Sequence, residues 1–506
     1  MKKCSLWVFL CVWPLLASAA TPLDGLTDWI EAERERWAIP GLAVAIVQGE
    51  EVLLAEGFGY LDLEQRRPVD ANTQFGIASL SKAMTATAMG ILVEEGRLDW
   101  DDRVIDHLPT FRLSDPWVTE QVTIRDLLSH RVGVGRLFGN RLTFMPEASL
   151  DEALAVLRHH EFEQPFRQAY VYSNAMYAVA GAVIESASGQ PWADFVEQRI
   201  FSPLDMARSS ARLSGLDGNA AHPHQQIDGE LVEIARRDWT WGAAAAAVNS
   251  TANDLGRWMQ FNLASEWDDN APVSPETLAQ IHSPANLLGF DAENGAVNAY
   301  ALGWSLGRHE RFHVLRHGGA TDGINSLIWL VPELNLGIAV SANRFTGFNT
   351  ALMQEVVARL AELPMEDWSE ALYAQHQDRL AEAAEARANL EQQRQEGTSP
   401  RHPLEAYVGE YQDPLYGVAE VRLEGDELQL RLWQDDSQQL RLEHWHHDTF
   451  RAHWQNPAQR EKFLWFGMGE EGLPAELHVR FTLRPLALEE GIYPADYVRT
   501  VRYRRR

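Results

Sequence analysis

Ser79 and Lys82 stand three residues apart in the segment Ser79-Leu-Ser-Lys82, a spacing that suits nucleophilic catalysis. In a helix, residues three apart share a face, so the lysine amine would lie beside the serine hydroxyl. A serine hydroxyl is a poor nucleophile until a neighbouring base takes its proton, and a neutral lysine can be that base. The pair therefore predicts a serine nucleophile. The structural alternative is an ordinary helix cap followed by a solvated lysine.

Lysine is rare in this chain, which singles out Lys82. The four lysines are Lys2, Lys3, Lys82 and Lys462, and the rest of the 44 basic residues are arginine. A guanidinium keeps its proton at neutral pH, whereas a desolvated ammonium can lose one. Proton exchange therefore explains why residue 82 is a lysine.

Four motifs follow one another along the chain and resemble the landmarks of a known superfamily. They are Phe75-Gly-Ile-Ala-Ser-Leu-Ser-Lys82, Thr123-Ile-Arg-Asp-Leu-Leu-Ser-His130, Tyr172-Ser-Asn174 and His317-Gly-Gly319. This set is similar to that of the serine β-lactamase and penicillin-binding-protein superfamily, with its class C-type β-lactamases, D-alanyl-D-alanine carboxypeptidases and related esterases. The resemblance covers roughly residues 23–363. It implies an α/β (α+β) fold in which helices flank an antiparallel sheet and a helical subdomain completes the unit.

The resemblance implies an acyl-enzyme mechanism. Ser79 would attack a carbonyl carbon while Lys82 and Tyr172 move protons, and which of these two is the general base stays open. A tyrosine phenol has a reference pKa of ~10, so Tyr172 needs an adjacent cation to act as a phenolate. The backbone N–H groups of Ser79 and Ala320 would form the oxyanion hole.

Asn174 and the segment 317–319 would position the substrate. Asn174 could donate to a substrate carbonyl and accept from Lys82, although a loop asparagine bonded to its own backbone is the alternative. Gly319 would let the substrate backbone approach its strand closely. His317 would be a hydrogen-bond donor and, for part of the time at neutral pH, a cation.

Gly318 departs from the family pattern, which usually has Lys-Thr-Gly or His-Thr-Gly at residues 317–319. Without the threonine hydroxyl, a contact often made to a substrate carboxylate is absent. An ester or a peptide without a free carboxylate at that position is therefore favoured. The alternatives are a β-lactamase or D,D-carboxypeptidase and, from another class, a non-catalytic binding or sensor protein on the same scaffold.

Hydrophobic patterning predicts the elements that carry these residues. A strand at 41–48 with a hairpin partner at 51–57 opens the domain, and a buried helix begins near Ser79 and runs to about residue 92. Residues 101–258 favour a helical subdomain. The expected later elements are strands near 302–305, 312–319, 326–330 and 336–340, and a helix at 350–363.

Composition changes after the expected hydrolase domain, residues 22–363. Residues 364–402 are highly charged, which is typical of an exposed helical linker. Residues 403–506 largely alternate apolar and polar side chains and predict a small antiparallel, β-barrel-like domain. Such a domain could line the cleft, mediate oligomerisation or bind a ligand.

Residues 1–19 are expected to be a signal peptide. A basic start at Met1-Lys2-Lys3 precedes an apolar run, and small residues Ala17-Ser18-Ala19 follow it. The run is shorter than the ~20 residues that span a bilayer, so cleavage is favoured over an uncleaved anchor. We expect an exported protein, periplasmic or extracellular, with no stable membrane insertion.

Composition also narrows the chemistry and the partners. Cys4 and Cys11 both lie in the expected signal peptide, which leaves the mature chain no thiol nucleophile. A net charge of −28 disfavours nucleic acid as a partner. The histidine clusters 222–224 and 444–447 lack the spacing of a zinc site, so no metal or organic cofactor is expected. The partner is expected to be a small-molecule or peptide substrate, and the oligomeric state is open.

Overall fold

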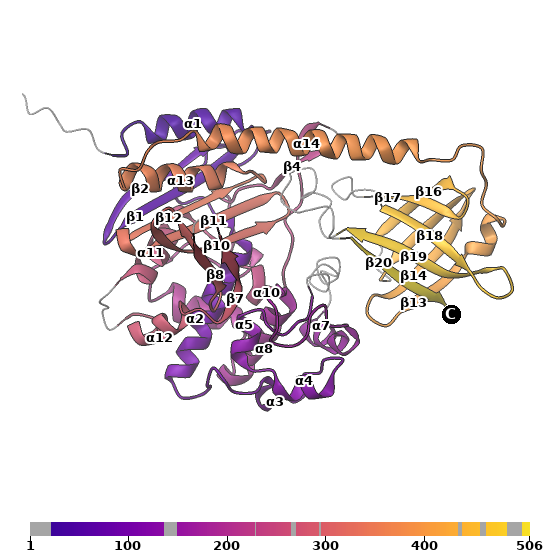
Figure 1. Cartoon of the computed structure of the whole chain (residues 1–506), viewed down its shortest axis with the longest axis horizontal. Helices are drawn as coiled ribbons and strands as arrows, with labels where there is room; N and C mark the ends of the chain where they lie inside the picture. Colours follow the sequence, from indigo (N-terminus) through magenta and orange to yellow (C-terminus); the bar gives the residue numbers. More distant parts are fainter. Residues whose placement is uncertain are drawn as a thin grey trace, which may run out of the picture.

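The computed structural model describes residues 22–135, 149–227, 229–264, 270–292, 295–433, 438–455, 462–482 and 498–506 (Figure 1). It contains a unit of sheet and helices, a long helix and a closed β-barrel. The expected antiparallel sheet with flanking helices and the expected antiparallel β domain after it are confirmed. The expected signal peptide at residues 1–19 lies outside the described ranges.

An eight-stranded antiparallel sheet forms the centre of the first unit, in the order β2-β1-β12-β11-β10-β9-β8-β7. Its strands are β1 (Gly41–Gln48), β2 (Glu51–Gly59), β7 (Asn286–Asp291), β8 (Ala296–Tyr300), β9 (Ser305–His309), β10 (Phe312–Thr321), β11 (Ile324–Val331) and β12 (Leu336–Ala342). Short two-stranded pairs join β3 (Phe75–Gly76) to β6 (Asn249–Ser250) and β4 (His224–Ile227) to β5 (Glu230–Glu233).

Both faces of the sheet are covered, as strand β1 illustrates. Its Leu42, Val44 and Ile46 belong to one buried cluster, together with residues of α1 (Leu26–Arg36) and α13 (Phe348–Leu360). The alternate residues Ala43 and Ala45 belong to the other cluster. Because neighbouring residues of a strand point to opposite faces, a continuous apolar run here indicates two buried faces.

Helices of the second cluster carry the first part of the candidate site. These helices are α2 (Ser81–Glu94), α3 (Val104–His107), α4 (Pro116–Gln121), α5 (Ile124–Leu128), α7 (Leu150–Val156), α8 (Asn174–Ser188), α9 (Trp192–Val196), α10 (Ala243–Ala246), α11 (Ala252–Leu263) and α12 (Pro275–Ile281). Helix α2 is buried at every position from Ser81 to Leu92. A helix that is buried all round lies at the centre of its subdomain.

One expected strand is wrong, and two hairpins were not expected. Residues 301–304 form a turn closed by the N–H of Ala301, which donates to the carbonyl oxygen of Trp304 at 2.7 Å. Gly303 has a φ of +83°, and a Cβ there would lie 2.8 Å from backbone atoms of Lys82 and Ala83. The segment therefore packs against α2 instead of extending the sheet. The unexpected hairpins are β4–β5 and β7–β8.

The second unit is a closed antiparallel barrel of eight strands. They are β13 (Gly409–Asp413), β14 (Gly417–Glu424), β15 (Glu427–Leu432), β16 (Gln439–His446), β17 (Thr449–Trp454), β18 (Lys462–Met468), β19 (Pro474–Thr482) and β20 (Val498–Arg505). Alternate residues such as Leu428, Leu430 and Leu432 are buried, because every second side chain of a barrel strand points inward. Pairing of β13 with β20 closes the ring.

The helix α14 (Trp368–Gln392) links the two units (Figure 1). The side chain of Trp37 anchors it to the first unit. The indole N–H of Trp37 donates to Ser369 Oγ at 2.9 Å, and its ring stacks on His376 with centroids 5.7 Å apart. Of the whole helix, only Ser369 and His376 are buried. No helix in the described ranges combines the length and apolar character needed to cross a membrane.

The end of α14 is anchored to the barrel by two arginines. Arg394 donates to the carbonyl oxygen of His444 at 2.9 Å, and Arg451 pairs with Glu391. Both guanidinium groups lie over the Trp445 ring, at 4.9 Å and 4.2 Å from its centroid. The helix therefore makes specific contacts at both of its ends.

Candidate active site

Ser79, Lys82 and Tyr172 converge in the structure. Ser79 lies in a short 3-10 turn, Ala78–Leu80, and Lys82 is the second residue of α2, which begins two residues after Ser79. The amine of Lys82 donates to Ser79 Oγ at 3.0 Å, and the hydroxyl of Tyr172 donates to the same oxygen at 2.8 Å. Lys82 is fully buried, and its amine also donates to the carbonyl oxygen of Ala245 at 2.9 Å.

The turn that carries Ser79 has a strained backbone and is held in place by hydrogen bonds. Ala78 has a φ of +46°, a conformation that a non-glycine residue adopts at a cost and that the surroundings must hold. The hydroxyl of Ser81 donates to the carbonyl oxygen of Ala78 at 2.6 Å and accepts from the N–H of Val248 at 3.1 Å. The N–H of Ile77 donates to the carbonyl oxygen of Val248 at 2.9 Å. The 247–249 segment thus holds the turn in place.

Gly319 on β10 meets this turn at very short range. A Cβ at Gly319 would lie 2.0 Å from the carbonyl oxygen of Ile77 and 2.9 Å from Leu80 Cδ1. Gly319 therefore has a reason within the chain itself, because the neighbour is the backbone of the Ser79 segment. The expected close approach of substrate backbone stays a prediction. Gly318 is exposed, and a Cβ there would meet Leu327 Cδ1 at an ordinary 3.8 Å.

Ala320 follows Gly319 on β10 and is thereby placed near Ser79. Strand β9 pairs with β10 only as far as Arg316, which faces Ser305, whereas β11 pairs with β10 through Thr321. Within the described residues, the half of β10 that contains Ala320 thus has a strand neighbour on one side. An extended segment of a substrate could lie along the other side. The oxyanion role of the Ser79 and Ala320 N–H groups stays a prediction.

Asn174 is placed differently from what the Tyr-x-Asn spacing suggests. It is the first residue of α8, although Ser173 before it is extended, with φ −141° and ψ 115°. Its Oδ1 is buried and accepts no hydrogen bond from the described residues, so the expected bond from Lys82 is not formed. A substrate-positioning role for Asn174 stays a prediction.

Aromatic rings enclose Lys82, and sequence reasoning missed most of them. Its amine lies 4.9 Å from the ring centroid of Tyr172 and 5.3 Å from that of Tyr177. The His130 ring lies 4.3 Å from that of Tyr172 and 4.8 Å from that of Tyr300. Burial raises the pKa of both Tyr177 and Tyr300 well above the usual value, so both stay neutral phenols.

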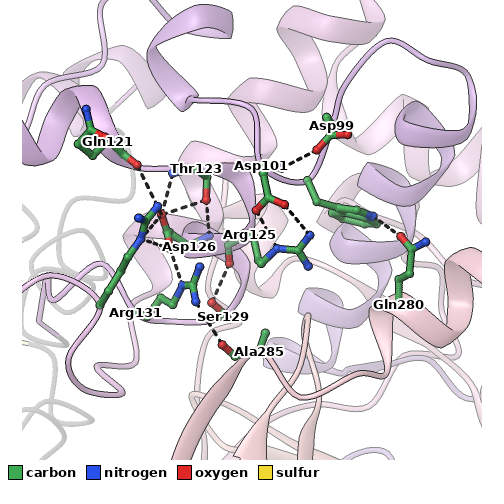
Figure 2. A network of polar contacts seen from close by, with 12 residues as sticks. Asp99, Asp101, Gln121, Thr123, Arg125, Asp126, Ser129, Arg131, Gln280 and Ala285 are labelled. Carbon is green, nitrogen blue, oxygen red and sulfur yellow. Dashed lines mark hydrogen bonds and ion pairs between the residues drawn. The ribbon is translucent and has the colours of Figure 1, made fainter.

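A buried carboxylate, Asp126, lies in a network of polar contacts with Thr123 and Arg131 (Figure 2). Asp126 is fully buried and pairs with Arg131 at 2.5 Å and with Arg167 at 2.6 Å. The backbone N–H of Val171 then donates to the carbonyl oxygen of His130 at 2.9 Å. Asp126 therefore links the end of the 123–130 motif to the strand-like segment that presents Tyr172. The 123–130 motif could be recognised in the sequence, but the structural role of Asp126 within it could not.

His317 is a neutral side chain, which corrects the expectation of a part-time cation. Burial lowers the pKa of His317 to about 3, and the nearby Lys82 amine lowers it further. Its Nδ1 donates to the carbonyl oxygen of Gly318 at 2.7 Å, which leaves Nε2 to accept from the Tyr300 hydroxyl at 2.9 Å. Both ring nitrogens are thus used within the chain. His317 therefore helps to fix the position of Tyr300 and offers no positive charge to a substrate.

Buried histidines should make folding pH-dependent. Burial lowers the pKa of His282 to about 4. The unfolded state therefore binds more protons below pH 6.5, and stability falls as the pH falls toward 4. We expect His282→Gln, whose amide can still donate to Asn262 Oδ1, to remove about 2 kcal/mol of the destabilisation between pH 7 and pH 5 in urea unfolding. The exposed His159→Gln is the control; an equal effect of both changes would contradict the expectation.

A cavity of about 380 Å³ adjoins the site. Ala246 and Ala247 line it, directly after the residue whose carbonyl binds Lys82, and so does Thr321, directly after Ala320. Trp192 and Trp239 also line it, and their indole N–H groups are bonded to Thr85 and Thr321. The two rings therefore present apolar surface to the cavity. Its lining also includes charged side chains, among them Arg212, Arg236 and Asp238, so the cavity can accept a group that is partly apolar and partly polar.

Metal ligation finds no support in the described residues, where no group of three or more His, Cys, Asp or Glu side chains is arranged to hold an ion. His222 is used in a contact with Glu233 at 2.5 Å, and His224 is buried beside Asn343. His444 contacts the carbonyl oxygen of His447 at 2.9 Å.

Known proteins share this architecture. The chain is similar to the unguisins hydrolase ungD of Aspergillus violaceofuscus, with 28% identity over 484 residues that cover 86% of this chain and 83% of that protein. Among solved structures it is similar to the octameric penicillin-binding protein homologue from Pyrococcus abyssi, with 22% identity, a TM-score of 0.61 and coverage of 90% and 98% of the two chains. It is also similar to a class C β-lactamase from Rhodobacter sphaeroides, with 20% identity, a TM-score of 0.54 and coverage of 67% and 99%.

Family matches cover both units. A domain of unknown function, DUF3471, matches residues 393–490, which include most of the barrel. The family described as Beta-lactamase matches residues 27–363, the whole sheet-and-helix unit. The resemblance expected from the four motifs is thereby confirmed, and the chain belongs to the β-lactamase family, with the serine hydrolase fold of that family.

Proposed function

We propose that this protein is a serine hydrolase that cleaves an ester or an amide through a covalent acyl-enzyme on Ser79. One observation carries the proposal. The Ser79 oxygen lies within hydrogen-bond distance of two proton-carrying groups, the buried Lys82 amine and the Tyr172 hydroxyl. A nucleophile in contact with a base, and a base oriented by a further group, is the arrangement that covalent catalysis requires.

In this mechanism the Ser79 oxygen bonds to the substrate carbonyl carbon, and its proton passes to Lys82 or Tyr172. The resulting oxyanion is held by the backbone N–H groups of Ser79 and Ala320. When the bond to the leaving group breaks, the stored proton goes to the leaving alcohol or amine. Water then attacks the acyl carbon and gives one proton to the same base. The bond from Ser79 Oγ to the acyl carbon breaks, Ser79 Oγ takes that proton back from the base, and the acid is released. Either Lys82 or Tyr172 fits the role of base.

The surroundings favour a substrate without a carboxylate next to the reacting carbonyl. Gly318 offers no hydroxyl and His317 no charge, so neither of these two residues would bind a carboxylate by its side chain. The cavity beside Ala246 has room for part of an acyl group, and its lining combines the rings of Trp192 and Trp239 with charged side chains. The name of the unguisins hydrolase supports hydrolysis as the reaction class. A β-lactamase or D,D-carboxypeptidase is the alternative, and turnover of nitrocefin or of a D-alanyl-D-alanine peptide distinguishes it.

A fluorophosphonate probe tests the nucleophile. We expect the intact mass to rise by one adduct, the adduct to map to Ser79 by peptide sequencing, and Ser79→Ala to stay unlabelled. Ser81→Ala is the matched control, because its hydroxyl lies in the same turn but bonds to backbone groups. Wild type without an adduct, or an adduct on Ser79→Ala, would contradict the proposal.

The rival class is a non-catalytic binding or sensor protein on the same fold. Hydrolysis of p-nitrophenyl acetate distinguishes the two classes. A hydrolase should turn over this ester and lose the activity in Ser79→Ala, whereas a binding protein should show no turnover in either form. We also propose that the chain is exported, on the strength of its first 19 residues. Intact-mass measurement after expression with and without those residues tests this, since cleavage near residue 20 is expected only for the full chain.

A further inference from the structure

The hairpin β7–β8 carries an unusual apolar surface. Its side chains Leu287, Leu288, Phe290 and Val297 are 68, 41, 67 and 60% exposed. Phe290 stands opposite Val297 in the hairpin register, so these two share one face. Single exposed apolar residues are common, but several on one hairpin indicate a binding surface. We call these four residues the hairpin surface.

The hairpin also has an open edge. Strand β7 is the last strand of the eight-stranded sheet, so one side of its backbone has no strand neighbour within the described residues. Edge strands are usually protected by charged side chains or proline, yet the only charged residue of β7 is its last, Asp291. An extended peptide can add to such an edge through backbone hydrogen bonds.

The base of the hairpin is part of the candidate active site. Asn286, the first residue of β7, pairs with Tyr300, the last residue of β8. Tyr300 bonds to His317, and the Asn286 amide donates to the carbonyl oxygens of Ser129 and His130 at 3.0 Å and 3.3 Å. The hairpin surface is therefore continuous with the ring cluster around Lys82.

Charge selects the kind of occupant. The chain has a net charge of −28, which disfavours an acidic occupant. The hairpin surface itself is uncharged, so a neutral apolar segment can approach it without that charge repulsion. We propose that the hairpin surface binds the apolar part of a neutral peptide substrate, which extends along β7 while its reacting carbonyl reaches Ser79. This proposal rests on the proposed function only for the role of Ser79.

Binding can be measured without turnover. The probes are two fluorescein-labelled peptide amides, Ala-Leu-Phe-Leu-Ala and its polar counterpart Ala-Ser-Asn-Ser-Ala, titrated into the full Ser79→Ala chain and followed by fluorescence polarisation. We expect the apolar peptide to bind and the polar one not to. Adding Leu287→Ser and Phe290→Ser should raise the dissociation constant of the apolar peptide by at least tenfold. Both side chains are exposed, so the thermal unfolding midpoint should be unaffected.

The matched control changes two equally exposed apolar residues elsewhere, Val52→Ser on the opposite edge strand and Met365→Ser after α13. It should leave peptide binding unchanged. In wild type, the apolar peptide should also inhibit p-nitrophenyl acetate hydrolysis competitively. Equal loss in both double variants, unchanged binding in Leu287→Ser/Phe290→Ser, or oligomers in sedimentation that only this variant dissociates would overturn the proposal. Absent ester turnover with intact peptide binding would overturn the proposed function alone.

Discussion

Replacing Lys82 by arginine is expected to lower kcat/KM for p-nitrophenyl acetate by about three orders of magnitude, the range that general acid–base catalysis supplies. Arginine keeps the positive charge near Ser79, but its guanidinium does not give up a proton near neutral pH. If Lys82 acted through its charge alone, much of the activity would remain. Fluorophosphonate labelling of Ser79 should slow in parallel, because it depends on the same proton transfer.

Packing must be separated from chemistry, since Lys82 is fully buried and arginine is larger. Lys462→Arg provides the matched control, because Lys462 is 3% exposed, burial lowers its pKa to about 8, and it lies in the barrel. Overpacking at either place should cost about 1–3 kcal/mol in urea unfolding. Only Lys82→Arg should abolish turnover. A kcat/KM of Lys82→Arg above a tenth of the wild-type value would contradict proton exchange at this residue.

Adding one methyl group at Gly319 is expected to reduce kcat/KM by about 10²–10³-fold, the cost of losing one oxyanion-hole donor. The new Cβ would lie 2.0 Å from the carbonyl oxygen of Ile77, so β10 must move away from the turn that carries Ser79. That movement would separate Ala320 from Ser79 and thereby open the proposed oxyanion hole. Steady-state kinetics with a p-nitrophenyl ester, together with the labelling rate of Ser79, measure the effect.

The neighbouring glycine supplies the control. At Gly318 the nearest atom to a new Cβ is 3.8 Å away, an ordinary contact, so Gly318→Ala should stay within about threefold of wild type. Circular dichroism and unfolding midpoints should show that both variants fold. Equal kinetic effects at the two positions would mean that strand flexibility, and not the contact with Ile77, controls the site.

Local motifs predicted the residues that meet at Ser79. This was possible because Ser79 and Lys82 are close together in the sequence. Ser79 and Lys82 lie on one turn of chain, so a spacing rule reports their contact directly. Tyr172 comes from 93 residues away, and only the family pattern connected it to the pair. Where neither rule applies, as for Tyr300 and Tyr177, the cluster forms through packing that one sequence does not display.

Properties that depend on burial were predicted less well. A reference pKa made His317 a part-time cation, but complete desolvation beside Lys82 makes it neutral. Gly319 signalled a close approach correctly, yet the approaching backbone is that of Ile77. The β7–β8 hairpin was missed because its exposed apolar residues, such as Leu287 and Phe290, invert the usual alternation of buried apolar and exposed polar side chains.

The helix α14 has a rotational consequence for the two units that it joins. Each residue of a helix adds about 1.5 Å of length and about 100° of turn. Trp37 contacts the first part of α14, and Trp445 contacts Arg394 just after its last residue. One residue inserted into the helix would therefore rotate the barrel by about 100° around the helix axis. Seven inserted residues would nearly restore its azimuth about 10 Å farther out. The length of this segment therefore sets which side of the barrel is turned toward the sheet-and-helix unit.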